Sequence, residues 1–290
     1  MASLKAIRRR IASVKSTQQI TRAMKLIAAA RLRRAQESLL AARPYSEALT
    51  RVADSLLNAE GVDLAPSENA QKRALVAVIA ADRGLCGGYN TNILRAGEET
   101  RRNLEADGFE VDYYAVGRKA VEHYKRSKAS IAVESVNNLP RLATIELART
   151  IASRMLADFQ SGAISEASIV YSRFHSAMTQ EPTYERLLPV PKQERKAEDG
   201  GAASVEYLIE PSPRELVPVV VRNYLEASVF HALLEAEASE NGAKMTAMDS
   251  ATNNASEMIE AYTLEMNRAR QAQITKELMD IVGGAEAIRG

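Results

Sequence analysis

The stretch LKAIRRRIASVKSTQQITRAMKLIAAARLRRAQ, residues 4–36, decides how this chain folds. It contains neither Gly nor Pro, and its apolar residues recur at alternating spacings of three and four, which is typical of a coiled-coil seam. We therefore expect residues 1–57 to form one long helix that must bury a stripe along its length. The seam runs through Leu4, Ile7, Ile11, Val14, Gln18, Thr21, Lys25, Ala28, Leu32, Ala35, Leu39 and Ala42.

The middle of this seam is polar. Gln18, Thr21 and Lys25 take three successive seam positions that an ordinary coiled coil fills with apolar side chains. Such an interruption lowers the stability of the helix pair, and it either fixes the register or marks a surface that faces a partner. The sequence leaves both interpretations open.

The C-terminal part of the chain shows the same pattern. Between Leu216 and Ile281 the only glycine is Gly242, and we expect Pro218 to lie in the first helical turn, which tolerates proline. We predict a second long helix over residues 214–290 that packs antiparallel on the first, so that each buries its stripe. Its seam runs through Met245, Met248, Thr252, Ala255, Ile259, Tyr262, Met266 and Ala269.

Residues 70–191, between the two long helices, alternate strand and helix patterns. This alternation predicts a Rossmann-like α/β domain with a mainly parallel sheet. Residues 192–213 are rich in charge and include Gly200 and Gly201, so they read as a loop or linker. The fold class is therefore α/β with a long antiparallel coiled coil. The expected strands are residues 74–81, 109–116, 131–133, 167–174 and 185–190, and the expected helices are 118–128 and 144–159.

The sequence contains few candidates for catalytic or ligand-binding residues. The glycine-rich segment 84–90 follows a predicted strand, but the chain has no G-x-G-x-x-G and no Gly-Lys-Ser/Thr, so we favour a tight turn over a ligand site. Cys86 has no histidine near it in sequence and is expected to be a small buried side chain. The paired carboxylates Glu235 and Glu237 are expected on a solvated helix face. We predict no catalytic, cofactor-binding or metal-binding residue.

Charge is balanced over the whole chain, with 38 Lys and Arg against 37 Asp and Glu, but it is uneven locally. Residues 1–43 carry eleven basic side chains and one acidic side chain, Glu37. We favour a solvated face complemented by acidic groups elsewhere over a nucleic-acid arm, because no aromatic residue precedes Tyr45. The helical pattern continues to Leu40, which argues against a cleaved transit peptide. The sequence contains no apolar run of about 18 residues, so no membrane-spanning helix is predicted.

Three stretches together resemble the gamma-subunit family of F-type ATP synthases, of the bacterial type, and the resemblance covers essentially the whole chain. The first pairs Arg8-Arg9-Arg10-Ile11 with Thr17-Gln18-Gln19-Ile20-Thr21-Arg22-Ala23-Met24-Lys25, and the second is Asp82-Arg83-Gly84-Leu85-Cys86-Gly87-Gly88-Tyr89-Asn90. The third is Asn267-Arg268-Ala269-Arg270-Gln271-Ala272-Gln273-Ile274-Thr275-Lys276-Glu277-Leu278 with Ile281-Val282-Gly283-Gly284-Ala285.

The resemblance implies a non-catalytic rotor shaft without a cofactor of its own. Its coiled coil would thread a hexamer of alternating alpha and beta subunits, and its α/β domain would lie with the epsilon subunit on the ring of c subunits. Rotation driven by proton flow would then change the catalytic beta subunits during ATP synthesis or hydrolysis. The implied location is peripheral, on the cytoplasmic side of the bacterial inner membrane.

The resemblance also assigns residues to partner contacts. Met24 and Lys25 match a segment that faces an acidic loop of the partner, and residues 192–213 match a foot that meets the c ring through Tyr207 and Glu210. The cysteine-bearing insertion of chloroplast relatives is absent, so thiol control is not expected. The matched contacts with the catalytic ring are Arg268, Arg270, Gln271, Thr275 and Glu277.

Two other functions rank below the rotor. A coiled-coil adaptor could bind nucleic acid through the basic N-terminal helix, and its binding to bulk DNA or RNA would fall steeply with salt. A Rossmann-like enzyme with helical extensions would bind a ligand as an isolated chain.

Overall fold

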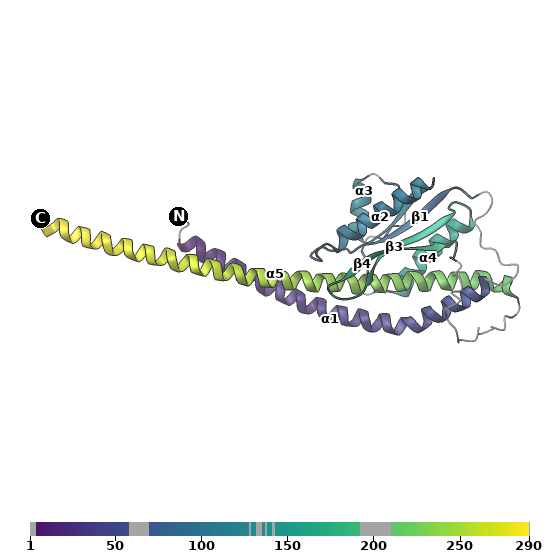
Figure 1. Ribbon diagram of the computed structural model, residues 1–290, viewed down its shortest axis with the longest axis horizontal. Coiled ribbons are helices and arrows are strands. Elements are labelled where there is room, and N and C mark those ends of the chain that lie inside the picture. The colour runs from purple at the N-terminus through teal and green to yellow at the C-terminus, as the bar shows by residue number, and fades with distance from the viewer. Residues whose placement is uncertain are drawn as a thin grey trace, which may run out of the picture. The chain divides into compact units, whose positions relative to one another are not determined.

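The computed structural model describes residues 4–57, 70–127, 129–131, 135–136, 138–140, 143–191, 210 and 212–289. Two long helices, α1 (Leu4–Leu57) and α5 (Pro213–Arg289), enclose a set of strands and shorter helices in the sequence (Figure 1). These are β1 (Arg73–Ile79), α2 (Tyr89–Ala106), β2 (Glu110–Val116), α3 (Arg118–Arg126), α4 (Ile145–Gln160), β3 (Glu166–Phe174) and β4 (Gln180–Leu188).

The described residues divide into two compact units. The two-helix unit consists of Met1–Ala28 and Met245–Gly290, and the α/β unit consists of Ala29–Lys244. Each long helix therefore contributes one segment to each unit. Among the described residues, no helix combines the length and the apolar character that crossing a bilayer requires.

The α/β unit is built on a four-stranded sheet with the order β2-β1-β3-β4. Strands β2, β1 and β3 are parallel, and β4 is antiparallel to β3. The predicted mainly parallel sheet is thus confirmed. Strand β4 begins at Gln180, five residues before the predicted start, because its first half carries Glu181 and Pro182 on an exposed sheet edge, where charge and proline are tolerated.

Helices cover both faces of this sheet (Figure 1). On one face Leu75, Ala77 and Ile79 of β1 belong to a core with α4 and α5. On the other face Ala74 and Val76 belong to a core with α2 and α3. Burial on both faces explains why β1 reads as a continuous apolar run rather than an alternating one.

The strand predicted at residues 131–133 is reduced to isolated bridges in the part that the structure describes. Ile131 forms a parallel bridge with Tyr113, and Val136 forms one with Val116. Residues 132–134 lie outside the described residues. Helix α2 was not predicted with bounds of its own.

Helix α5 begins at Pro213, one residue before the predicted start. Ser212 is positioned as a cap: its Oγ accepts a hydrogen bond from the backbone N of Glu215 at 3.4 Å and donates one to Glu215 Oε1 at 2.9 Å. The Ser-x-x-Glu spacing is that of a capping box, except that the Glu215 carboxylate accepts from the Ser212 hydroxyl instead of the Ser212 backbone N, and Pro213 fills the first helical position. Pro218 consequently lies inside the helix, beyond the first turn, so the expectation for Pro218 was wrong.

The paired carboxylates of α5 are not on a solvated face. Glu235 is buried, and its Oε2 accepts a hydrogen bond from the backbone N of Phe174 at 2.6 Å. Glu237 Oε2 accepts one from the backbone N of Ala143 at 2.8 Å. The prediction was wrong because this part of α5 packs on the sheet, where a helix is covered on several sides and its carboxylates satisfy backbone donors instead of water.

The glycine-rich segment after β1 forms the predicted tight turn. Leu85 and Gly87 adopt positive φ values of 64° and 57°. The side chain of Asn90 closes the turn, since its Oδ1 accepts a hydrogen bond from the backbone N of Ala81 at 2.9 Å. Cys86 is buried as expected, and burial raises the pKa of its thiol, which lowers its reactivity.

Candidate partner-binding surface of the two-helix unit

The two-helix unit is an antiparallel coiled coil. All seam positions predicted within this unit are buried or half-buried on both helices. The tightest are Ile7 and Ala28 on α1, with exposed fractions of 1%, and Met248 and Ala255 on α5, with 5%. Ala28 and Ala255 are small and Met248 is flexible, so the helices can approach closely at these places.

Polar side chains hold the two helices in register. Gln18 Nε2 donates a hydrogen bond to Ser256 Oγ at 2.7 Å, and the hydroxyl of Thr252 donates one to Thr21 Oγ1 at 2.8 Å. Because residue numbers rise along α1 as they fall along α5, these pairs confirm the antiparallel direction. Sliding by one turn would break both interhelical hydrogen bonds, although the hydroxyls of Thr21, Thr252 and Ser256 would keep acceptors on their own helices. Of the two interpretations left open, the structure favours register fixing.

The third polar pair lies at the surface. Lys25 Nζ contacts Asp249 Oδ1 at 2.5 Å, and the two side chains are 39% and 47% exposed. Solvent screens a pair this exposed, so it contributes about 0.2–1 kcal/mol at most. Met24, next to it, is half-buried. The predicted Met24–Lys25 contact region therefore lies where an approaching protein could compete for either charge.

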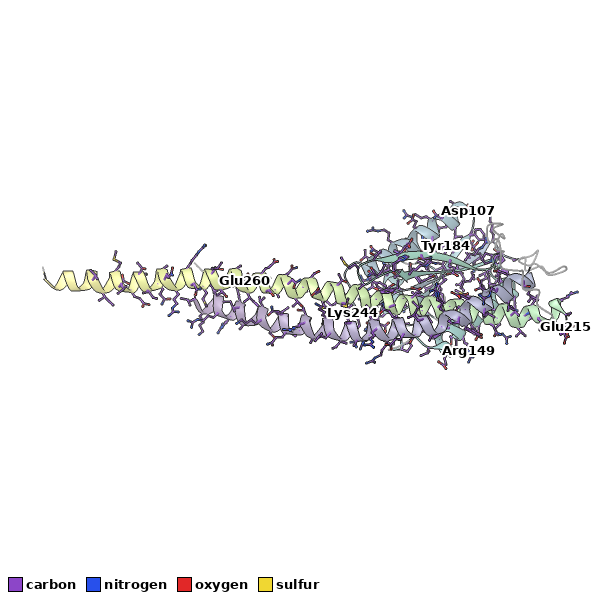
Figure 2. The ribbon with its side chains drawn as sticks, turned by 60° about the horizontal axis from the view of Figure 1, so that its bottom comes forward. Asp107, Arg149, Tyr184, Glu215, Lys244 and Glu260 are labelled. Atoms are coloured by element: carbon purple, nitrogen blue, oxygen red, sulfur yellow. The ribbon has the colours of Figure 1, made fainter. Side chains whose placement is uncertain are left out.

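Helix α5 continues past the N-terminal end of α1 (Figures 1 and 2). The register that pairs Gln18 with Ser256 places Leu4 opposite residue 270. Beyond that point, residues 271–284 are all exposed. We call residues 271–284 the C-terminal overhang.

The C-terminal overhang carries an apolar stripe that nothing in the described chain covers. Ile274, Leu278, Ile281 and Val282 are spaced by four, three and one, so they share one helix face. Their exposed fractions are 46%, 57%, 68% and 61%. A stripe of this kind on a soluble helix marks a surface for a partner.

The sequence-predicted contact residues fall into separate bands along this unit. Gln271 follows Asp249, the partner of Lys25, by 22 residues, or roughly 33 Å of helix. Glu277 accepts a hydrogen bond from Gln273 Nε2 at 2.9 Å. Tyr207 lies outside the described residues, and Glu210 is exposed. The exposed residues of the α5 band are Arg268, Arg270, Gln271, Thr275 and Glu277.

Three exposed apolar residues of α1 were not predicted as contacts. Ile20, Leu26 and Ile27 have exposed fractions of 58%, 64% and 54%. The available signal was their position outside the seam, since large aliphatic residues there gain nothing from the helix pair. They adjoin the Met24–Lys25 region and widen it into a mixed apolar and basic surface.

The basic face of α1 is largely unpaired inside the described chain. Lys25 has its ion pair with Asp249, whereas six other cations of this segment contact no described carboxylate. All six are exposed, as a solvated face requires, and the acidic complement stays a prediction. They are Lys5, Arg8, Arg9, Arg10, Lys15 and Arg22.

Comparison with known sequences identifies the class of this coiled coil. A protein-family model described as ATP synthase matches residues 3–288. The ATP synthase gamma chain of Moorella thermoacetica is 43% identical over the full length of both chains. That of Geobacter metallireducens is 44% identical, also over the full length of both. The chain therefore belongs to the ATP synthase gamma-chain family.

Comparison with solved structures gives the same fold. A chain from the central stalk and c-ring of the Tetrahymena thermophila mitochondrial ATP synthase is 25% identical and superposes with a TM-score of 0.60, covering 80% of this chain and 99% of that one. A chain from the rotor of the Euglena gracilis enzyme is 21% identical with a TM-score of 0.66, covering 93% and 98%. The α/β fold with its long antiparallel coiled coil is confirmed.

Proposed function

We propose that this chain is the central rotor shaft of a bacterial F-type ATP synthase and has no active site of its own. It would turn with the c ring and the epsilon subunit inside a hexamer of alpha and beta subunits. The complex would lie on the cytoplasmic face of the inner membrane, with this chain attached only through its partners. Nucleotides would be bound by the alpha and beta subunits.

The observation that carries this proposal is the C-terminal overhang of the two-helix unit. A helix whose apolar stripe is uncovered over residues 271–284 is suited to a surrounding bearing of other subunits. Because the chain belongs to the ATP synthase gamma-chain family, we identify these surrounding subunits as alpha and beta.

The physical basis of the coupling is a difference in contacts. The two helices present unlike faces, with the exposed cations of α1 on one and the carboxylates Glu257 and Glu260 of α5 on another. As the shaft turns, each beta subunit would meet a different face. A contact that favours one conformation of a beta subunit shifts the affinity for nucleotide by the corresponding free energy.

We assign the contacts in three bands. Met24 and Lys25 would face an acidic loop of the catalytic ring, where the Lys25 ammonium could exchange Asp249 for the carboxylates of that loop. The foot, residues 192–213 with Tyr207 and Glu210, would meet the polar loops of the c ring. The upper contacts with the catalytic ring would be Arg268, Arg270, Gln271, Thr275 and Glu277.

Substitution of Met24 tests the coupling role. Met24→Lys places a second cation beside Lys25, which adds local repulsion and strengthens attraction to an acidic partner loop. In membrane vesicles carrying the whole ATP synthase, we expect less proton pumping for each ATP hydrolysed. Met24→Leu keeps the apolar volume and should retain normal coupling. Unchanged coupling in Met24→Lys would contradict the assignment of Met24 as a contact.

A further inference from the structure

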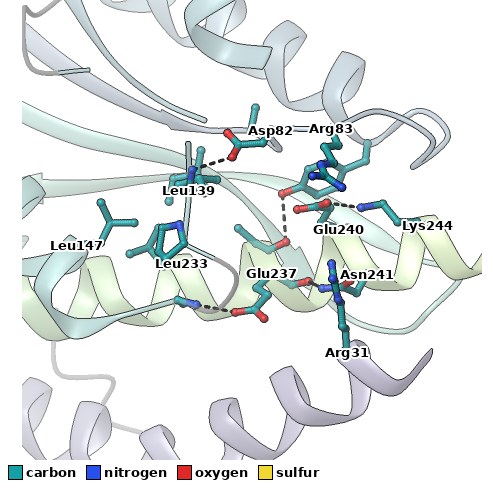
Figure 3. A pocket seen from close by; sticks show the side chains of 16 residues that line it. Arg31, Asp82, Arg83, Leu139, Leu147, Leu233, Glu237, Glu240, Asn241 and Lys244 are labelled. Carbon is teal, nitrogen blue, oxygen red and sulfur yellow. Dashed lines mark hydrogen bonds and ion pairs between the residues drawn. The ribbon is translucent and has the colours of Figure 1, made fainter. Parts of the chain in front are cut away.

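A cavity of about 240 Å³ lies in the α/β unit at the carboxyl end of β1 (Figure 3). Its walls come from α1, the end of β1 with the turn after it, the start of α2, the segment leading into α4 with the first turn of α4, and α5. In the sheet β1 lies between β2 and β3. Helix α2, which connects β1 to β2, covers one face of the sheet, and helix α4, which precedes β3, covers the other. Ligands of open α/β sheets bind at such a switch point.

Three of the six charged residues that line this cavity already have partners within the protein. Asp82 accepts hydrogen bonds through both carboxylate oxygens, from the backbone N of Arg118 at 2.8 Å and of Leu139 at 2.7 Å. Glu240 Oε1 lies 2.5 Å from Lys244 Nζ. The side chains of Asp82, Glu240 and Lys244 could bind a ligand only if these existing hydrogen bonds and the ion pair were broken.

Two exposed guanidinium groups form no ion pair with a described carboxylate, although the charge of Arg31 acts on the nearby carboxyl of Glu237. Arg31 from α1 and Arg83 from the turn after β1 both line the cavity, and neither contacts a carboxylate within the described chain. In Figure 3 Arg31 extends from α1 toward Asn241 on α5. A pair of arginines at one cavity suits an anionic group, because each planar fork can donate two hydrogen bonds to a phosphate or carboxylate.

One acceptor inside the cavity also lacks a partner. Glu237 Oε2 is held by the backbone N of Ala143, but the buried Oε1 has no hydrogen-bond donor among the described residues. Burial raises the pKa of this carboxyl. A buried oxygen without a donor costs free energy, which a hydroxyl or amino group of a ligand would recover.

Apart from Tyr89 and Asn241, the remaining wall is apolar, and the volume is small. Ile79, Leu139, Pro140, Leu147 and Leu233 supply aliphatic surface. The volume lies below the roughly 300–1,000 Å³ of sites for drug-sized ligands. The cavity therefore suits a compact organic anion of about the size of a sugar phosphate.

We propose that this cavity binds a small hydroxylated organic phosphate, with Arg31 and Arg83 on the phosphate and Glu237 Oε1 accepting a hydrogen bond from a ligand hydroxyl. The ligand would join α1, α5 and the carboxyl end of the sheet within the α/β unit. The site is independent of the rotor role, which requires no small ligand in this chain.

Calorimetric titration of the full chain with ribose 5-phosphate tests the proposal. We expect saturable binding of one molecule, weakened about tenfold in Arg31→Gln and in Arg83→Gln because each removes a charged hydrogen-bond donor. Arg34→Gln removes an exposed cation of α1 that does not line the cavity, and should leave the affinity unchanged within about twofold. Absence of saturable binding up to about 10 mM, or equal weakening by all three variants, would overturn the proposal.

Glu237→Gln tests the hydroxyl contact separately. Glutamine can still accept the hydrogen bond from Ala143 N, but its amide would turn a donor toward the ligand in place of Oε1. We expect ribose 5-phosphate to bind roughly fivefold more weakly and inorganic phosphate, held only by the arginines, to bind as in the unchanged protein. Equal losses for both probes would reject a contact between Glu237 and the hydroxyl.

Discussion

Helix α5 contains two consecutive stretches with apolar stripes, and only one of them is buried within the described chain. From Met245 to Ala269 the stripe is covered by α1. From Gln271 to Gly284 every residue is exposed. If the paired register continued, it would pass through Gln273, Lys276, Asp280 and Gly283, all poor seam residues. The apolar stripe instead shifts to a different face of the helix.

This difference separates pairing within the chain from pairing with another chain. An apolar stripe that keeps one register can be covered by the other helix of the same chain. A stripe that changes to another face where that helix ends faces away from it and is available to another chain. The change of face occurs within the sequence itself, near residue 270. Four predictions test whether the two stretches really differ in this way, from the largest expected effect on stability to the smallest.

The largest effect should come from the paired stretch. Ile7 is 1% exposed in the seam, so Ile7→Ala removes buried methyl groups and leaves a cavity, at a cost of about 2–5 kcal/mol. Ile20 on the same helix is 58% exposed, and Ile20→Ala should change the free energy of opening by less than about 0.5 kcal/mol. Amide hydrogen exchange at residues 4–28 of the full chain measures both. Equal effects would mean that the seam is not the stabilising contact.

Sequence reasoning recovered the long helices and their seams because a heptad pattern depends on helix geometry alone. It recovered β1 and the tight turn at Gly84–Asn90 for a similar local reason. It misplaced Glu235, since only the sheet packed against α5 reveals that a carboxylate there meets the backbone N of Phe174. It also missed Ile20 and Leu26, although the predicted seam already excluded both and so offered the signal.

The next effect concerns register. Thr21→Val removes the acceptor of Thr252 on α1, although the Thr252 hydroxyl can still donate to the carbonyl of Met248, and should destabilise the helix pair by about 0.5–1 kcal/mol. The double variant Thr21→Val/Thr252→Val removes donor and acceptor together and should recover most of that stability. Hydrogen exchange again gives the free energies. Additive losses in the double variant would show that the two hydroxyls do not interact.

A smaller effect is expected at the surface pair. Lys25→Ala, Asp249→Ala and the double variant form a cycle that isolates the interaction of the two charges. Because both side chains are more than a third exposed, the coupling free energy should be about 0.5 kcal/mol and should fall as salt is raised. A coupling that is large and independent of salt would mean that the pair is effectively buried.

The smallest effect on the isolated chain should come from the C-terminal overhang. Ile281 is 68% exposed, so Ile281→Ala should change the free energy of unfolding by less than about 0.5 kcal/mol. If the stripe contacts other subunits, as we propose, the same variant should bind an assembled alpha–beta hexamer about fivefold more weakly, equivalent to about 1 kcal/mol. Lys276→Ala, on the same overhang but outside the stripe, is the matched control.

The free energy of unfolding and the affinity for the hexamer together distinguish the two stretches, because substitution of a buried residue and of an exposed residue changes different quantities. Substitution of a seam residue such as Ile7 lowers the stability of the chain even without a partner, whereas substitution of an overhang residue lowers only the affinity for the partner. Unchanged binding of Ile281→Ala, with Lys276→Ala also unchanged, would place the contacts of the catalytic ring elsewhere on the two-helix unit. The mixed surface of Ile20, Leu26 and Ile27 would then be the next position to substitute.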